Sequence, residues 1–82
     1  LSEAISRANR SDYGLGSAIF TQDEDEIEQA VRDLETGSTF VNALVASDPR
    51  LPFGGVKQSG YGRELAADGI KAFVNRKTVS VA

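Results

Sequence analysis

Apolar residues recur at helical spacing in three parts of the chain. The strongest pattern runs through residues 23–36, where polar residues occupy the opposite side. Its apolar positions stand three and four residues apart: Ile27, Ala30, Val31 and Leu34. Weaker versions of the pattern cover residues 2–10 and 64–74. Ser2 is suited to cap the first helix and Gly37 to end the middle one, so the sequence predicts three helices.

Two short runs of β-branched and aromatic residues flank the middle helix. One run covers residues 15–21 and the other residues 38–42. A run that is apolar on both faces is typical of a parallel strand, and two such strands joined by a helix form a right-handed βαβ unit. A last segment, 77–81, alternates apolar and polar residues and has no obvious partner strand within the chain. We therefore predict an α/β fold in which the βαβ unit is followed by a long loop, a helix and a C-terminal strand.

Four consecutive acidic residues, Asp23 to Glu26, stand at the start of the middle helix. Negative side chains at this end interact favourably with the helix dipole, each by ~0.3–1 kcal/mol. Thr21 and Asp23 each have a glutamate three residues later, which is the capping-box spacing. The same acids could instead bind a cation, but the sequence offers no histidine or spaced acid to complete such a site. We interpret the cluster as a helix start.

The stretch from Leu51 to Glu64 concentrates glycine and aromatic residues, and we call it the glycine loop. It holds four of the chain's eight glycines and one of its two prolines. Its backbone is therefore expected to form turns and close approaches that side chains would block. Unlike a flexible Gly/Ser linker, it interleaves Phe53, Val56 and Tyr61 with polar residues that need partners. We expect another surface to pack on it.

Glycine-rich stretches often bind phosphate, but the spacing here does not fit that function. A P-loop ends in Gly-Lys-Ser/Thr, whereas Lys57 follows a valine and precedes a glutamine. Gly60 and Gly62 could begin a dinucleotide fingerprint, but Leu65 occupies the third glycine position and no strand pattern runs directly into the loop. The glycine loop is therefore not predicted to bind a nucleotide.

The chain has 82 residues, no cysteine and no histidine. A chain of this length forms one small domain at most and buries only roughly 60–65% of its unfolded surface. The missing thiol and imidazole remove the disulfide staple, the commonest metal ligand and the commonest general base. The net charge of −3 argues against nucleic acid as a partner, and no apolar run is long enough to span a membrane.

The glycine loop resembles the C-terminal signature of the aldehyde dehydrogenase superfamily, Pro-Phe-Gly-Gly-x-Lys-x-Ser-Gly-x-Gly-Arg-Glu. The matching residues are Pro52, Phe53, Gly54, Gly55, Lys57, Ser59, Gly60, Gly62, Arg63 and Glu64. Further matches to the family lie in Ala8-Asn9 with Asp12 to Leu15, in Gly37 to Asn42, and in Lys77 to Val79. The sequence from Val45 to Lys57 is most similar to that of bacterial succinate-semialdehyde dehydrogenases.

The resemblance implies an NAD(P)-dependent enzyme that oxidises an aldehyde, here expected to be succinate semialdehyde, through a thioester to the acid. Members of the superfamily use a cysteine nucleophile, a glutamate base and an asparagine-lined oxyanion site, all upstream of the matched region. Because this sequence has no cysteine, we expect an inactive C-terminal fragment of a cytoplasmic enzyme, and the fragment itself is expected to bind no NAD or NADP. The alternative is a stand-alone oligomerisation module without catalytic activity.

The resemblance also implies which residues face the substrate, namely Phe53, Ser47 and Val45. Phe53 would form an apolar wall of the aldehyde tunnel that excludes water. The Ser47 hydroxyl would bond the distal carboxylate of succinate semialdehyde. Each has a plainer alternative, Phe53 as a core aromatic and Ser47 as a loop hydroxyl that caps a turn. Arg50 could assist a carboxylate, but a solvated loop charge is the simpler interpretation.

A second implied group of residues lies between subunits: Lys57, Ser59, Arg63, Asn75, Val79 and Val81. The family's last strand adds to the sheet of a neighbouring subunit, so we expect a homo-oligomer, a dimer or tetramer, formed through residues 77–81. The family pairs Arg63 with an acid across the interface, and Asn75 stands at that position here, which leaves a hydrogen bond at most. On this interpretation residues 1–62 belong to the catalytic domain, and residues 63–82 supply the last helix and the oligomerisation strand.

Overall fold

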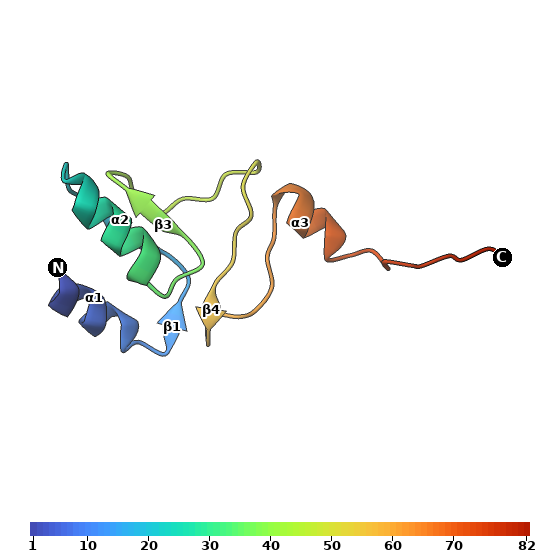
Figure 1. Ribbon diagram of the computed structural model, residues 1–82, viewed down its shortest axis with the longest axis horizontal. Coiled ribbons are helices and arrows are strands. Elements are labelled where there is room, and N and C mark those ends of the chain that lie inside the picture. Colours follow the sequence, from blue (N-terminus) through green and yellow to red (C-terminus); the bar gives the residue numbers. More distant parts are fainter.

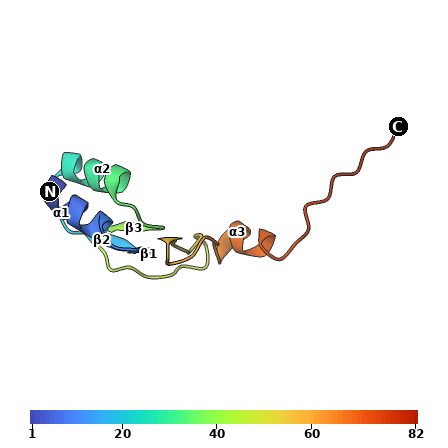
Figure 2. The same cartoon turned by 90° about the horizontal axis from the view of Figure 1, so that it is seen from below.

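The chain folds into a small body with a long C-terminal extension. A computed structural model describes all 82 residues. Figure 1 shows the first two helices and the strands gathered at one end, and the last helix and the tail running away from them. The molecule measures 56 × 24 × 24 Å, and the tail leaves the body in both views (Figure 2).

The first helix, α1 (Ser2–Asn9), covers most of the predicted range. Leu1 occupies its N-cap position and makes no side-chain hydrogen bond there, so the prediction that Ser2 caps the helix is wrong. Ser2 lies inside the first turn, and its hydroxyl instead accepts a hydrogen bond from the Gln29 side chain at 2.9 Å. Ile5 is only 7% exposed and attaches α1 to the body.

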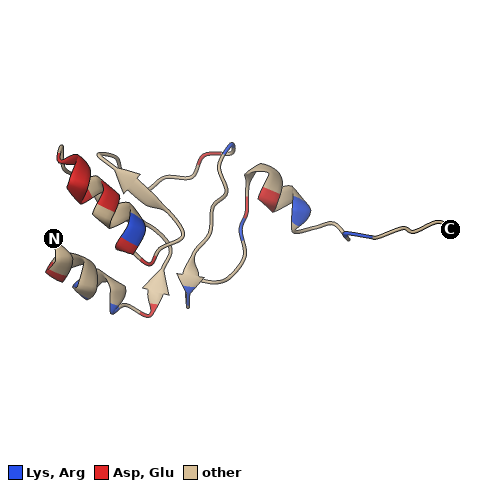
Figure 3. Ribbon diagram, viewed as in Figure 1, with Lys and Arg blue, Asp and Glu red and all other residues tan.

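The second helix, α2 (Glu24–Asp33), starts as the sequence predicts. The Asp23 carboxylate accepts hydrogen bonds from the backbone N–H groups of Asp25 and Glu26, at 2.9 and 3.2 Å. Acidic residues occupy the first turn of α2, at the positive end of the helix dipole, and colour this part of the ribbon red in Figure 3. Capping and the dipole together account for the acidic cluster.

The other end of α2 differs from the prediction. Gly37 does not terminate the helix, because Leu34 already has an extended backbone with a ψ of 123°. Leu34 instead lines an apolar cavity that it shares with Ile5 of α1 and Ala30 of α2. α2 thus ends before the local glycine signal, at the point where the Asn9 side chain bonds the Asp33 carbonyl oxygen and the Glu35 N–H.

Strands β2 (Ser17–Ile19) and β3 (Thr39–Val41) lie on either side of α2 in the sequence and pair in parallel. The register sets Ser17 opposite Thr39. The Ser17 hydroxyl lies 2.9 Å from the Thr36 hydroxyl and 3.0 Å from the Thr39 hydroxyl, which holds the start of the pair together. The order strand, helix, strand and the parallel pairing agree with the prediction, although both strands are shorter than expected.

A second, antiparallel pair of strands was not predicted. It joins β1 (Tyr13–Gly14) to β4 (Val56–Lys57), with Gly14 opposite Val56. The sequence suggested a turn at Gly14 and an irregular loop around Val56, because strands of two residues carry no readable periodicity. The pairing brings the glycine loop beside the connection between α1 and β2 (Figure 1).

The core of the chain is small. Ile5 and Ala30 are its buried apolar residues, with exposed fractions of 7% and 0%. Larger apolar side chains stay exposed, among them Phe20 at 65% and Phe73 at 92%. A domain that folded alone would cover more of its apolar surface, so we expect further protein surface to pack on these faces.

The third helix, α3 (Ala66–Lys71), is shorter than the predicted range of 64–74. Leu65 and Ala66 have positive φ angles of 65° and 51°. This left-handed conformation costs a non-glycine residue about 1–2 kcal/mol and cannot continue a right-handed helix. None of the three helices has the length and apolar character needed to cross a bilayer.

The tail beyond α3 extends away from the body (Figure 2). Residues 75–82 are exposed and make no backbone hydrogen bond to the rest of the chain. Residues 77–81 form no strand within this chain, which differs from the prediction, and their addition to the sheet of another subunit stays a prediction.

Candidate functional site

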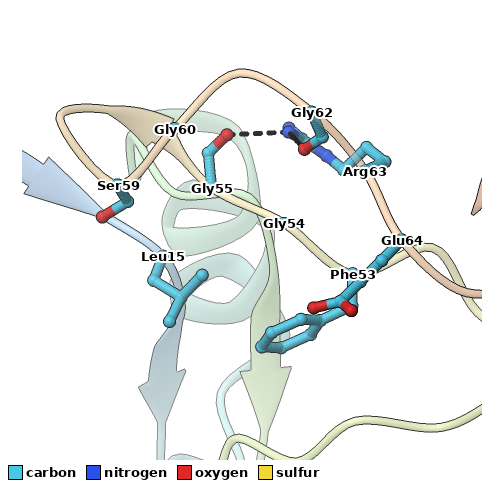
Figure 4. Close-up of a pocket in the computed structure, with 9 residues that line it drawn as sticks. All are labelled: Leu15, Phe53, Gly54, Gly55, Ser59, Gly60, Gly62, Arg63 and Glu64. Carbon is cyan, nitrogen blue, oxygen red and sulfur yellow. Dashed lines mark hydrogen bonds between the residues drawn. The ribbon is translucent and has the colours of Figure 1, made fainter. Parts of the chain in front are cut away.

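The glycine loop folds back on itself and encloses an open cleft of about 310 Å³ beside β1. Figure 4 shows the side chains of Leu15 and Phe53 on one side of the loop backbone, and Arg63 reaching between its two arms. The residues that line the cleft are Leu15, Phe53, Gly54, Gly55, Ser59, Gly60, Gly62, Arg63 and Glu64. Much of the lining is glycine, so the few side chains present decide its character.

Phe53 is held at the rim of the cleft by its backbone. Its N–H donates to the carbonyl oxygen of Glu64 at 2.8 Å, and the Glu64 N–H donates back at 2.7 Å. The two residues form an isolated antiparallel bridge, and the Phe53 side chain is half-buried. A ring fixed in this way presents a rigid apolar surface to a ligand in the cleft.

Arg63 ties the two arms of the glycine loop together. One terminal nitrogen of its guanidinium donates to the carbonyl oxygens of Gly55, at 2.7 Å, and Gly62, at 2.9 Å. The arms approach closely, since a Cβ on Gly54 would lie 2.3 Å from the Gly62 carbonyl oxygen. Within this chain, Arg63 therefore holds the shape of the cleft.

Lys57 and Ser59 fasten the glycine loop to the body. The Ser59 hydroxyl accepts a hydrogen bond from the Gly14 N–H at 3.0 Å. The Lys57 ammonium donates to the carbonyl oxygen of Asn9 at 2.7 Å and pairs with the Glu35 carboxylate at 2.7 Å. Both polar groups are thus engaged inside the chain, and their predicted contact with a second subunit stays a prediction.

Ser47 and Val45 lie in the segment between β3 and the glycine loop. Both are exposed, and neither lines the cleft next to Phe53. Val45 instead lies against Gly16, where an added Cβ would stand 2.8 Å from the Val45 Cγ1. This chain therefore does not bring the three predicted substrate residues together, and their shared role stays a prediction.

Arg50 is paired with Asp48 in the same exposed segment. Its Nε lies 3.0 Å from one carboxylate oxygen and a terminal nitrogen 2.6 Å from the other. This side-chain hydrogen bonding lowers the pKa of the Asp48 carboxyl, helped by the Arg50 backbone N–H, and raises the pKa of the Arg50 guanidinium. With 86% of the Arg50 side chain exposed, the interpretation as a solvated loop charge fits.

Arg32 and Asp33 form a second exposed pair, at the C-terminal end of α2. Their side chains are joined by hydrogen bonds of 2.8 and 3.2 Å. The hydrogen bonding again lowers the pKa of the carboxyl and raises that of the guanidinium. Neither residue lines the cleft, so this pair belongs to the helix end and not to the site.

Three residues that hold the glycine loop were not identified from the sequence, namely Asn9, Glu35 and Gly37. The Asn9 side chain joins the ends of the two helices, donating to the Asp33 carbonyl at 2.7 Å and accepting from the Glu35 N–H at 2.9 Å. Gly37 packs directly against Gly54. Asn9 and Gly37 stand in segments that match the family pattern, but their contacts join parts of the chain far apart in sequence.

Comparisons with known proteins identify the family of the chain. The sequence model of the aldehyde dehydrogenase family matches residues 1–79. The chain belongs to the aldehyde dehydrogenase family. This aldehyde dehydrogenase chain is 57% identical over 79 residues to an aldehyde dehydrogenase of Paenarthrobacter nicotinovorans, and the match covers 96% of the chain and 17% of the relative.

Relatives whose names specify a substrate are nearly as similar. The aldehyde dehydrogenase chain is 53% identical over 81 residues to succinate-semialdehyde dehydrogenase (NADP+) 1 of Mycobacterium ulcerans, covering 99% of the chain and 18% of the relative. A crystal structure of succinic semialdehyde dehydrogenase from Streptococcus pyogenes with NADP+ superposes with a TM-score of 0.90 at 45% identity, covering 98% of this chain and 18% of that one. The chain thus spans 17–18% of the length of these relatives.

Proposed function

We propose that this chain forms a wall of the aldehyde channel and part of the subunit interface in an NAD(P)-dependent enzyme that oxidises succinate semialdehyde to succinate. The observation that carries the proposal is the fixed position of Phe53 on the cleft, bonded through its backbone to Glu64. The similarity to proteins named succinate-semialdehyde dehydrogenase supports the choice of substrate.

The proposed role of Phe53 follows from its chemistry. A rigid apolar ring excludes water from the path of the aldehyde, which protects a thioester intermediate from early hydrolysis. The attacking thiol of such a reaction has to come from outside these residues, because the sequence contains no cysteine. The chain would therefore shape the channel and orient the aldehyde, while other parts of the enzyme carry out the covalent step.

The dinucleotide is proposed for the whole enzyme and not for the glycine loop. The glycine loop lacks the spacing of a P-loop and of a dinucleotide fingerprint, because Lys57 stands between Val56 and Gln58 and Leu65 occupies the third glycine position. The two relatives named above with NADP+ support a nicotinamide dinucleotide as the hydride acceptor. When bound, the cofactor would supply oxidation of the aldehyde carbon.

Ser47 provides the test of the substrate. In the full-length enzyme, Ser47→Ala is expected to raise KM for succinate semialdehyde about tenfold, because a hydrogen bond to the distal carboxylate is lost. The matched control substrate is an uncharged aldehyde of similar length, for which KM stays nearly constant. Phe53→Ala is expected to raise KM for both aldehydes. Equal effects of Ser47→Ala on both substrates would remove Ser47 from the carboxylate site.

We also propose that the tail assembles the enzyme. Val79 and Val81 are 73% and 87% exposed, and the backbone of residues 75–82 is unpaired, which suits addition to a sheet edge of another subunit. Asn75 would lie at the same interface. A full-length enzyme truncated after Asn75 is expected to lose subunits in light scattering, and an unchanged mass would contradict this role.

A further inference from the structure

The ammonium group of Lys57 has three acceptors within reach. Its Nζ lies 2.7 Å from the carbonyl oxygen of Asn9, 3.2 Å from that of Ser11 and 2.7 Å from Oε2 of Glu35. An ammonium carries three N–H donors, so each donor can be directed to one acceptor. The Lys57 side chain is only 26% exposed, which distinguishes it from a flexible surface lysine.

The three acceptors come from separate parts of the body. Asn9 ends α1, Ser11 follows in the next turn, and Glu35 lies just beyond α2. The carbonyls at the end of α1 form the negative end of its dipole, which favours a cation. Asn9 also bonds the backbone of Asp33 and Glu35 through its side chain. Lys57 therefore attaches the glycine loop at the point where the ends of α1 and α2 are already joined.

The backbone of Lys57 is strained to make this attachment. Its φ of 56° lies in the left-handed region, which a non-glycine residue adopts only at an energetic cost. The conformation is held by the Gln58 N–H, which donates to the Asp12 carbonyl at 2.9 Å. A glycine would adopt this conformation without that cost. The contacts of the Lys57 ammonium therefore offset the backbone strain that a lysine has at this position.

The segment between Lys57 and Phe53 is packed too closely to absorb a shift. Val56 pairs with β1, and the Gly54 carbonyl lies against the α-carbon of Gly37. Both contacts involve backbone atoms, which cannot move aside as the end of a flexible side chain can. Lys57 and Phe53 therefore belong to one closely packed segment, which is fastened to the body at these two contacts and at the Lys57 side chain.

We infer that Lys57 is a positioning residue for the aldehyde channel. Its bonds to Asn9 and Glu35 hold the glycine loop, and with it Phe53, in the place from which the ring lines the channel. The inference rests on the proposed function of Phe53. Lys57 acts on substrate binding and not on the chemical step, since its side chain does not line the cleft.

The test is steady-state kinetics of the full-length enzyme carrying Lys57→Met, which keeps the length of the side chain and removes its charge. We expect KM for the aldehyde to rise about five- to tenfold, while kcat per active site changes less than about twofold. Glu35→Gln, which keeps a neutral acceptor, is expected to raise KM about two- to threefold. Lys71→Met, on an exposed lysine of α3 outside this network, is the matched control and leaves KM unchanged.

Two further measurements separate positioning from stability. Active-site titration gives the fraction of intact sites, and a Lys57→Met enzyme with fewer sites but an unchanged KM would overturn the inference. Amide hydrogen exchange across residues 46–60 is expected to speed up in Lys57→Met and not in Lys71→Met. Failure of the proposed function differs, because the unmodified enzyme would then not oxidise the aldehyde. In that case the role of Lys57 in an aldehyde channel is rejected as well, and faster exchange in Lys57→Met would show only that its side chain holds the glycine loop.

Discussion

The backbone of Gly54 lies directly against the α-carbon of Gly37. A Cβ on residue 37 would stand 1.6 Å from the Gly54 carbonyl oxygen and 2.9 Å from the α-carbon of Gly55. Real Cβ atoms essentially never come this close to backbone atoms, so no side chain fits at residue 37 without displacing the glycine loop. The turn before β3 and the loop that carries Phe53 are therefore docked backbone to backbone.

Gly37→Ala is expected to destabilise the protein because the Gly54 carbonyl cannot move aside. Forcing a methyl group into a packed site costs about 1–3 kcal/mol, and backbone contact places this position at the upper end. Gly62→Ala is the matched control, since nothing lies within 4 Å of a Cβ built there. Urea unfolding of the full-length protein measures both variants, and equal midpoints would show that the contact between residues 37 and 54 is loose in solution.

Asp23→Ala is expected to lower the free energy of unfolding by about 0.5–2 kcal/mol, because the N–H groups of Asp25 and Glu26 lose their acceptor. Asp23→Asn keeps an oxygen that accepts the same bonds and is expected to lose only a fraction of that amount. Thermal unfolding compares the two variants. A matching loss in both would assign the effect to charge at the helix dipole and not to the cap.

The pairing of Asp48 with Arg50 predicts a pH dependence at low pH. The folded-state pKa of Asp48 is lowered, chiefly by hydrogen bonding to the Arg50 side chain. Its contribution to stability is thus fully present above the unfolded pKa, near 3.9, and is lost as the pH falls through the lower folded pKa. Both side chains face solvent, so added salt is expected to weaken the effect.

Carboxyl titration by NMR measures this shift directly. In Arg50→Met the pKa of Asp48 is expected to rise toward the ordinary value of an aspartate. Arg76→Met, on the exposed tail, serves as the control and leaves the Asp48 pKa where it is. If the Asp48 pKa is the same in Arg50→Met as in the unmodified protein, the ion pair does not persist in solution.

Much of the fold follows from local sequence patterns, and the exceptions share a cause. The apolar spacing of Ile27, Ala30 and Leu34 predicts α2, and the two flanking runs predict the parallel pair β2 and β3. Local signals do not predict where α2 ends, before Gly37, or where α3 begins, after Leu65. At both places contacts with distant segments determine the backbone conformation. The pairing of β1 with β4 is invisible in the sequence, because two residues in each strand leave no period to read.

Only part of the candidate site was predicted, because its other contacts also join segments that are far apart in the sequence. Phe53 was predicted from the resemblance of the glycine loop to the aldehyde dehydrogenase signature, and it does line the cleft. Asn9 and Glu35 are ordinary polar residues when read in order along the chain. Their importance appears only when folding brings Lys57, from the glycine loop, to the helix ends.

Engagement of its ammonium group has a consequence for the chemical reactivity of Lys57. Acylating reagents have to reach the amine, and the Lys57 Nζ lies among three oxygen acceptors on a side chain that is only 26% exposed. Of the three lysines in the chain, Lys71 on α3 and Lys77 on the tail lie outside this network of acceptors and are the ones expected to react early. The order in which the lysines are labelled thus reports whether the glycine loop is docked on the body, without any substrate being turned over.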